Sequence, residues 1–333
     1  HRFSYYESIV TGGGMEQTED RRRIIVYLAF AFGIAWATSL IVYLTGGLRD
    51  SPMVIPSANV NLAFILIAGP VMWSPALAHL ATRWLTREGW ADVYLRPRLR
   101  REWPYWAAAW VVPGLLTIVG LVVYFLLFPQ HYDADLAVLR EMLEAAPVDP
   151  EEVNLWVLVA VQILQGMLIA PFVNGIATFG EEFGWRGYLQ PKLLALGLNP
   201  RWAMVVMGVI WGVWHWPVIL MGHNYGLAYP GSPFLGPLAM VWFTLAAGTL
   251  LGWLTYKARS VWPAVIGHAA LNGMANLGAI FVQGDPNPLL GPLPVGLLGG
   301  IGFTGVALVL LMVPALWERE DEARVPEAPE GGS

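Results

Sequence analysis

The sequence contains no cysteine, and only 13% of its 333 residues are charged. The absence of cysteine excludes disulfide bonds, thiolate metal ligands and a cysteine nucleophile. The net charge is −5 and no basic stripe runs along the chain, so the sequence predicts no nucleic-acid partner. An internal repeat of the kind found in many transporters is also missing. Instead, 56% of the residues are hydrophobic and 17 are tryptophan, which is typical of a polytopic membrane protein.

Eight apolar segments are each close to the ~20 residues that a helix needs to cross a bilayer. We therefore predict an all-α, multi-pass membrane protein with about eight transmembrane helices. The predicted spans are residues 24–45, 62–84, 104–128, a fourth from 155 toward 180, 203–221, 235–256, 261–282 and 295–317. Residues 1–14 precede Met15, which could be the natural start, and they are left out of the fold prediction. Residues 15–317 then form one membrane domain, followed by a disordered tail over residues 318–333.

The basic residues predict the orientation of these spans. Eight spans place both termini on the same side, and sixteen of the 19 lysines and arginines fall on that side. They are Arg2, Arg21, Arg22, Arg23, Arg83, Arg87, Arg96, Arg98, Arg100, Arg101, Lys192, Arg201, Lys257, Arg259, Arg319 and Arg324. Only Arg49 and Arg140 fall on the opposite side. Because cytoplasmic loops carry the excess of basic residues, we expect both termini in the cytoplasm.

Two adjacent carboxylates and an arginine interrupt the apolar sequence in the stretch GEEFGWRG, residues 180–187. Ionisable groups at membrane depth are costly, so they usually face a protein-lined cavity and take part in function. On a helix, Glu182 and Arg186 are four residues apart and can form an ion pair, whereas Glu181 points about 100° away. Glu181 is therefore the carboxylate without a local partner. The alternative interpretation is a solvated ion pair at a cytoplasmic helix end.

The depth of Glu181 depends on where the fourth span ends. A helix that stops before Gly180 leaves Glu181 at the cytoplasmic surface, whereas a helix over residues 171–196 places it near the middle of the bilayer. Pro171 favours a break or a tilt at that point. The sequence leaves both alternatives open.

Two other predicted spans carry polar side chains. In the fifth span Trp211 and His215 are four residues apart and share a helical face. In the seventh, His268 and Asn272 have the same spacing. A single buried histidine is more often structural than catalytic, but three spans with such groups indicate one shared site. The remaining histidines are interpreted differently: His79 as structural, His131 as solvated and His223 as interfacial.

If these side chains meet, they can activate water. A carboxylate in apolar surroundings can accept a proton, and imidazole can share that proton or donate to a leaving group. A histidine N–H and an asparagine amide can stabilise an oxyanion. Glu181, His215 and His268 could instead bind zinc, which commonly takes three such ligands in catalytic sites. Neither His-Glu-x-x-His nor Gly-x-Ser-x-Gly occurs, so the sequence lacks two rival hydrolase motifs.

Taken together, the three motifs resemble the CPBP family, the CAAX-protease and bacteriocin-processing group of intramembrane proteases. The family pattern is Glu-Glu-x-x-x-Arg, then Phe-x-x-x-His, then His-x-x-x-Asn/Asp. The matching residues here are Glu181-Glu182-x-x-x-Arg186, Trp211-x-x-x-His215 and His268-x-x-x-Asn272. The resemblance covers about residues 171–273. Its departure is Trp211 in place of phenylalanine, an exchange that we expect to narrow the cavity without removing chemistry.

The resemblance implies an intramembrane endopeptidase, of the kind often called a metalloprotease, that hydrolyses a peptide bond of a membrane-associated or lipidated protein or peptide. It implies that Glu181 activates water, that His215 shares the proton transfer, and that His268 with Asn272 stabilises the transition state. Glu182 and Arg186 would hold the geometry of the site. The expected partners are the lipid bilayer and a prenylated or peptide substrate.

Two alternatives to this interpretation remain. The glutamate mechanism requires no cofactor, and we favour it over zinc held by Glu181, His215 and His268. A non-catalytic membrane scaffold or bacteriocin immunity protein of the same fold is the competing function.

Overall fold

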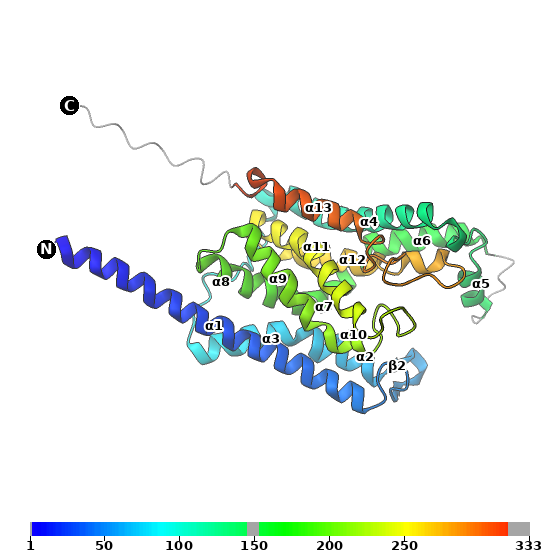
Figure 1. Ribbon diagram of the computed structural model, residues 1–333, viewed down its shortest axis with the longest axis horizontal. Helices are drawn as coiled ribbons and strands as arrows, with labels where there is room; N and C mark the ends of the chain where they lie inside the picture. The colour runs from blue at the N-terminus through cyan, green and yellow to red at the C-terminus, as the bar shows by residue number, and fades with distance from the viewer. Residues whose placement is uncertain (1, 145–152, 319–333) are drawn as a thin grey trace.

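The computed structural model describes residues 2–144 and 153–318, with side chains from Gln17 onward. The described chain is helical apart from one short hairpin, which confirms the predicted all-α class (Figure 1). Its first half contains α1 (Arg2–Leu44), β1 (Met53–Ile55), the 3₁₀ turn η1 (Pro56–Ala58), β2 (Val60–Asn61), α2 (Leu62–Leu66), the π-helical η2 (Ile67–Val71), α3 (Met72–Thr86), α4 (Leu99–Leu127), η3 (Pro129–His131) and α5 (Ala137–Glu144). Its second half contains α6 (Leu155–Leu168), α7 (Ala170–Gly184), the π-helical η5 (Trp185–Leu189), α8 (Gln190–Ala195), α9 (Pro200–Trp214), α10 (Trp216–Leu220), α11 (Leu235–Ala258), α12 (Trp262–Met274), η6 (Leu277–Phe281), α13 (Ile301–Met312) and η7 (Pro314–Trp317).

The protein is an integral, multi-pass membrane protein. Five described helical segments are long and apolar enough to cross a membrane: Gln17–Leu44, Leu62–Thr86, Leu99–Leu127, Leu235–Ala258 and Trp262–Phe281. A sixth span forms if Leu155–Leu168 and Ala170–Ala195, which meet at a bend of 45°, are taken together. The predicted count of eight is therefore not confirmed for the described residues. Most of the predicted tail, residues 319–333 with Arg319 and Arg324, lies outside them.

Local sequence explains why the fifth and eighth predicted spans are short. The α9 helix ends at Trp214, and a new helix starts at Trp216, because Pro217 has no N–H to continue the hydrogen bonding of α9. The eighth predicted span becomes a helix only from Ile301 to Met312. Its first residues belong to the Gly- and Pro-rich segment 291–300, which folds into turns. Glycine and proline weaken a helix, so composition alone overstated the length of both spans.

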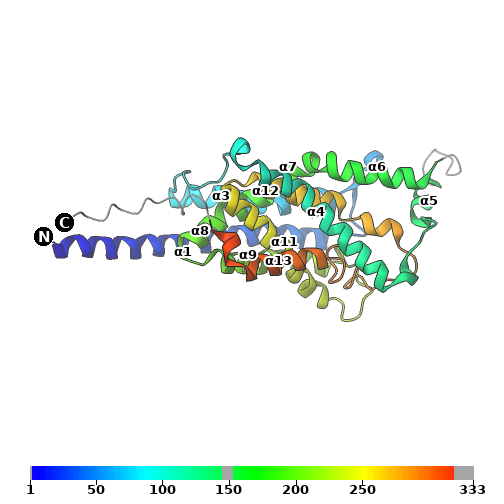
Figure 2. The same cartoon turned by 90° about the horizontal axis from the view of Figure 1, so that it is seen from above.

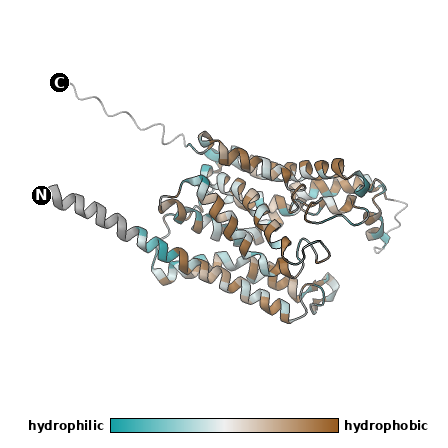
Figure 3. Ribbon diagram, viewed as in Figure 1, coloured by the Kyte–Doolittle hydropathy of each residue, from teal (hydrophilic) through white to brown (hydrophobic). Residues whose placement is uncertain are grey.

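The helices form a bundle in which α11 and α12 are central. In the most apolar 18 residues of each span, 67% of the α11 span and 61% of the α12 span is buried inside the protein. The corresponding share is 33% for α1 and for α4. The outer helices therefore present apolar faces that suit contact with lipid. Figures 1 and 2 show that the start of α1 and the end of α13 lie at the same end of the bundle. We call this the terminal end. Figure 3 shows apolar residues over the length of the helices.

A buried ionic cluster ties three helices together at the terminal end. Lys192 of α8 lies 3.1 Å from Asp20 of α1 and 3.2 Å from Asp92, and it also contacts Glu88. Arg83 of α3 lies 2.7 Å from Asp92. Burial alone would raise the pKa of Asp92, but its hydrogen bond to Arg83 and the nearby positive charges lower that pKa below its ordinary value. The cluster anchors the end of the helix that carries the two glutamates.

Candidate active site

The two glutamates lie in the middle of an unbroken helical segment. Backbone turns continue from Ala170 through the π-helical η5 to Ala195, and the preceding bend lies just before Pro171, as predicted. Of the two alternatives for the fourth span, the structure therefore has the longer one, which continues past Gly180. Glu181 is 3% exposed and Glu182 is fully buried. A solvated ion pair at a helix end is thus wrong, because this part of the helix is enclosed by protein.

Close packing of α7 against α3 encloses the pair. A Cβ atom on Gly180 would lie 2.9 Å from the carbonyl oxygen of Met72, and one on Gly184 would collide with the backbone of Pro75. Only glycine permits this approach. On another face, the Thr178 hydroxyl donates to the Val265 carbonyl of α12 at 3.1 Å. The α7 helix is therefore held between α3 and α12.

Glu182 is held by two partners. Nη1 of Arg186 lies 3.0 Å from each of its carboxylate oxygens, which confirms the predicted ion pair. Nδ1 of His268 lies 2.9 Å from Oε1. A carboxylate only accepts hydrogen bonds, so Nδ1 of His268 carries the hydrogen. This His268–Glu182 contact was not predicted, and it joins residues 86 positions apart. Glu182 is a structural anchor that orients His268.

Glu181 instead lines a cavity. Its Oε2 accepts a hydrogen bond of 2.7 Å from Nε1 of Trp211 on α9. From the sequence, Trp211 was expected only to narrow the cavity, and its role as a hydrogen-bond donor was not predicted. The signal was present, because indole carries an N–H that a phenylalanine ring lacks. The guanidinium of Arg186 lies over the same indole, 4.7 Å from the ring centre. Trp211 therefore links the two carboxylates and fixes the orientation of Glu181.

His215 lies where α9 ends. Its Nδ1 is 2.8 Å from the backbone carbonyl of Trp211, which can only accept, so Nδ1 again carries the hydrogen. When the ring is neutral, Nε2 is the nitrogen left with a free lone pair. The His215 ring packs edge-on against Trp214, with centres 4.7 Å apart. In the neutral state His215 therefore presents a proton acceptor, not a donor, to the cavity.

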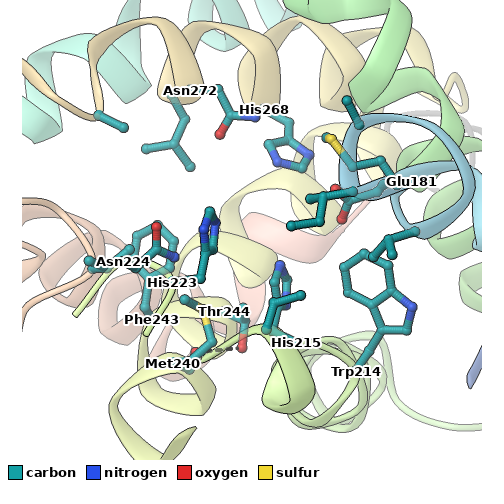
Figure 4. Close-up of a pocket in the computed structure, with 18 of the residues that line it drawn as sticks. Glu181, Trp214, His215, His223, Asn224, Met240, Phe243, Thr244, His268 and Asn272 are labelled. Atoms are coloured by element: carbon teal, nitrogen blue, oxygen red, sulfur yellow. Dashed lines mark hydrogen bonds between the residues drawn. The ribbon is translucent and has the colours of Figure 1, made fainter. Parts of the chain in front are cut away.

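One cavity of about 490 Å³ brings the predicted residues together. Its lining includes Glu181, Trp211, His215, His268 and Asn272. Figure 4 shows Asn272 beside His268 on α12, across the cavity from His215. The three predicted motifs thus converge in space.

Five further polar side chains line this cavity, and Asn61 and Asn276 are two of them. His223, predicted to be interfacial, and Asn224 come from the loop after α10, and Thr244 comes from α11 (Figure 4). A loop residue has no helical spacing to the motifs, so the sequence contained no pattern that could place His223 at the site. His79 is buried outside the cavity, with Nδ1 2.9 Å from the Phe183 carbonyl, in line with a structural role.

Zinc held by Glu181, His215 and His268 stays a prediction. Within residues 2–144 and 153–318, no three His, Cys, Asp or Glu side chains are placed so that they could hold one metal ion. His268 directs Nδ1 to a carboxylate and His215 directs Nδ1 to a carbonyl, an arrangement that metal-binding histidines commonly share.

Comparison with known proteins agrees with this geometry. Residues 154–274 match the family model described as Type II CAAX prenyl endopeptidase Rce1-like. Over these residues the chain is similar to the CPBP family. A CAAX prenyl protease 2 from Methanococcus maripaludis is 31% identical over 105 residues, which is 31% of this chain and 38% of that protein. The chain thus aligns with well under half the length of this curated relative. All seven motif residues of this chain lie within the family match.

Proposed function

We propose that this chain is an intramembrane endopeptidase that hydrolyses a peptide bond of a membrane-associated or lipidated protein or peptide. The proposal rests mainly on the different surroundings of two adjacent carboxylates. Glu182 is buried and bound by Arg186 and His268, whereas Glu181 has one donor, Trp211, and lines the cavity. Glu181 is therefore the carboxylate available to a water molecule in the cavity.

The first step is attack by water. Glu181 accepts a proton from the water, and the water oxygen forms a bond to the carbonyl carbon of the scissile peptide. The π electrons of the carbonyl move to its oxygen, which becomes an oxyanion. The amide NH₂ of Asn272 and an N–H at Nε2 of His268 lie on one face of α12 and donate to that oxyanion. Preformed donors in a site shielded from water stabilise this charge strongly.

His268 can donate from Nε2 only when its ring is protonated, because Nδ1 is already bound to Glu182.

The second step is collapse of the tetrahedral intermediate. The carbon–nitrogen bond breaks, and the leaving amine takes up the proton that Glu181 received from water. His215 lies beside Trp211 and presents Nε2 to the cavity, so it can accept and return this proton. The products are a carboxylic acid and an amine, and no other reactant is consumed.

Replacement of Glu181 tests the proposal. Glu181→Gln keeps the size of the side chain but removes the base, so cleavage of a peptide library by the purified protein in detergent should stop. The matched control is Glu182→Gln, which weakens the contacts to Arg186 and His268 and should lower the melting temperature as well. Near-normal cleavage by a folded Glu181→Gln variant would rule out the glutamate mechanism. Elemental analysis of the same samples addresses zinc: one zinc per wild-type chain that is lost in Glu181→Gln would replace our mechanism with a metal-dependent one.

A further inference from the structure

The cavity opens at the end of the bundle opposite the terminal end. Its lining comes from the first turns of the second span at α2 and η2, the first half of α11 and the last turns of α12. Three loops complete it, and each lies at the end away from the start of α1: the loop after α1, the loop after α10 and the segment before α13. We call this the mouth end. Glu181 and Trp211 lie on the inner side, and the ionic cluster of Lys192 lies beyond them.

Basic residues gather at the other end. Sixteen lysines and arginines were predicted to be cytoplasmic, and the structure describes most of them. These lie at the start of the first span, the end of α3, the segment 87–101, α8, the start of α9 and the end of α11. All of these elements meet at the terminal end (Figure 1). Among the residues that the structure describes, only Arg49 and Arg140 lie in segments at the mouth end. By the positive-inside rule, the terminal end faces the cytoplasm, and the mouth end faces away from it.

The chemistry of the lining restricts what can enter. Among its described residues, Glu181 is the only carboxylate, and no lysine or arginine is present. A free C-terminal carboxylate would find no lysine or arginine and would be repelled by Glu181, and a charged side chain would be desolvated without compensation. The volume of about 490 Å³ is that of a pocket for a small ligand, so it admits a short extended peptide but not a folded domain.

Together these observations carry one inference, which rests on the proposed function. We infer that the cavity receives its substrate from the non-cytoplasmic side of the membrane, as an extended, uncharged internal segment of a polypeptide. Such a segment borders the membrane on the external face, in a membrane protein or in an exported peptide precursor. A cytosolic peptide tail that ends in a free carboxylate lacks access to the cavity, and its carboxylate lacks a lysine or arginine partner there.

Cysteine labelling tests from which side of the membrane the cavity is reached. The sequence contains no cysteine, so each introduced cysteine carries the only thiol. Asn276 is exposed and lines the mouth of the cavity, and Arg96 is exposed at the terminal end. We expect Asn276→Cys to react with a membrane-impermeant maleimide in right-side-out spheroplasts and Arg96→Cys to react only in inside-out vesicles. The reverse pattern would overturn the inference. This readout does not depend on proteolysis, so it stands even if Glu181→Gln disproves the proposed function.

The substrate part is tested with two fluorogenic peptides added to the same spheroplasts. Both carry the same uncharged sequence, and they differ in an amidated or a free C-terminus. We expect the amidated peptide to be cleaved at least as fast as the free acid, with no cleavage by Glu181→Gln. A bulky maleimide on Asn276→Cys should block cleavage from outside. A strict requirement for the free carboxylate, or cleavage only in inside-out vesicles, contradicts the inference, as does failure to cleave either peptide from either side.

Discussion

At the level of single residues, the site uses neighbours in sequence for opposite tasks. Oε1 of Glu182 contacts both Arg186 and His268, whereas Glu181 lines the cavity. Helical geometry predicts this division, because adjacent residues point about 100° apart. The partners from other helices could not be predicted in the same way. Trp211 meets Glu181 across 30 positions of sequence, and only the folded bundle brings their atoms together.

Asn272 permits a clean test of oxyanion stabilisation. Its side chain is exposed in the cavity, one helical turn beyond His268. We expect Asn272→Ala to lower kcat by about 10²–10³, the usual cost of losing one oxyanion donor, with little change in KM. Steady-state kinetics on a cleaved peptide measure both values.

The comparison variant is His268→Ala, which also removes the contact to buried Glu182. It should lose at least as much activity and melt at a lower temperature, because a buried carboxylate loses a donor. Equal activity of wild type and Asn272→Ala would remove Asn272 from the catalytic group.

At the level of elements, proline and glycine decide where the sequence-based prediction holds. The break before Pro171 was predicted, and the bend of 45° lies there. The sixth and seventh predicted spans agree closely with Leu235–Ala258 and Trp262–Phe281. The fifth and eighth failed because an average over apolar residues ignores Pro217 and the glycines between 291 and 300. Hydropathy identifies a span, but it does not locate the residue at which the helix stops.

The α7–α3 interface makes a prediction about Gly184. A Cβ atom at this position would collide with the backbone of Pro75, which cannot move without shifting α3. We expect Gly184→Ala to cost about 1–3 kcal/mol, the range for overpacking, and to reduce cleavage because Glu181 and Glu182 move with α7. Thermal unfolding in detergent and peptide cleavage measure the two effects.

Gly175 on the same helix is the control. The nearest atom to a Cβ there is Val265 Cγ1 at 4.0 Å, an ordinary contact. Gly175→Ala should be neutral or slightly stabilising, because alanine is the better helix former. If both variants melt like the wild type, close approach of α7 and α3 is not what encloses the glutamates.

At the level of the whole molecule, the fold fixes which end of the bundle carries the cavity mouth, and charge decides which way that end faces. Basic residues at the terminal end and their scarcity at the mouth end predict a cytoplasmic terminal end. Gln130 follows α4 at the mouth end, where the Gln283 side chain donates to its carbonyl at 3.2 Å. Reporter fusions after Gln130 should therefore read external, and fusions at Arg96 or after Trp317 should read cytoplasmic. A cytoplasmic reading at Gln130 would reverse the orientation of the protein. The same fold would then open its cavity to cytosolic tails, and Asn276→Cys would have to be labelled from inside as well.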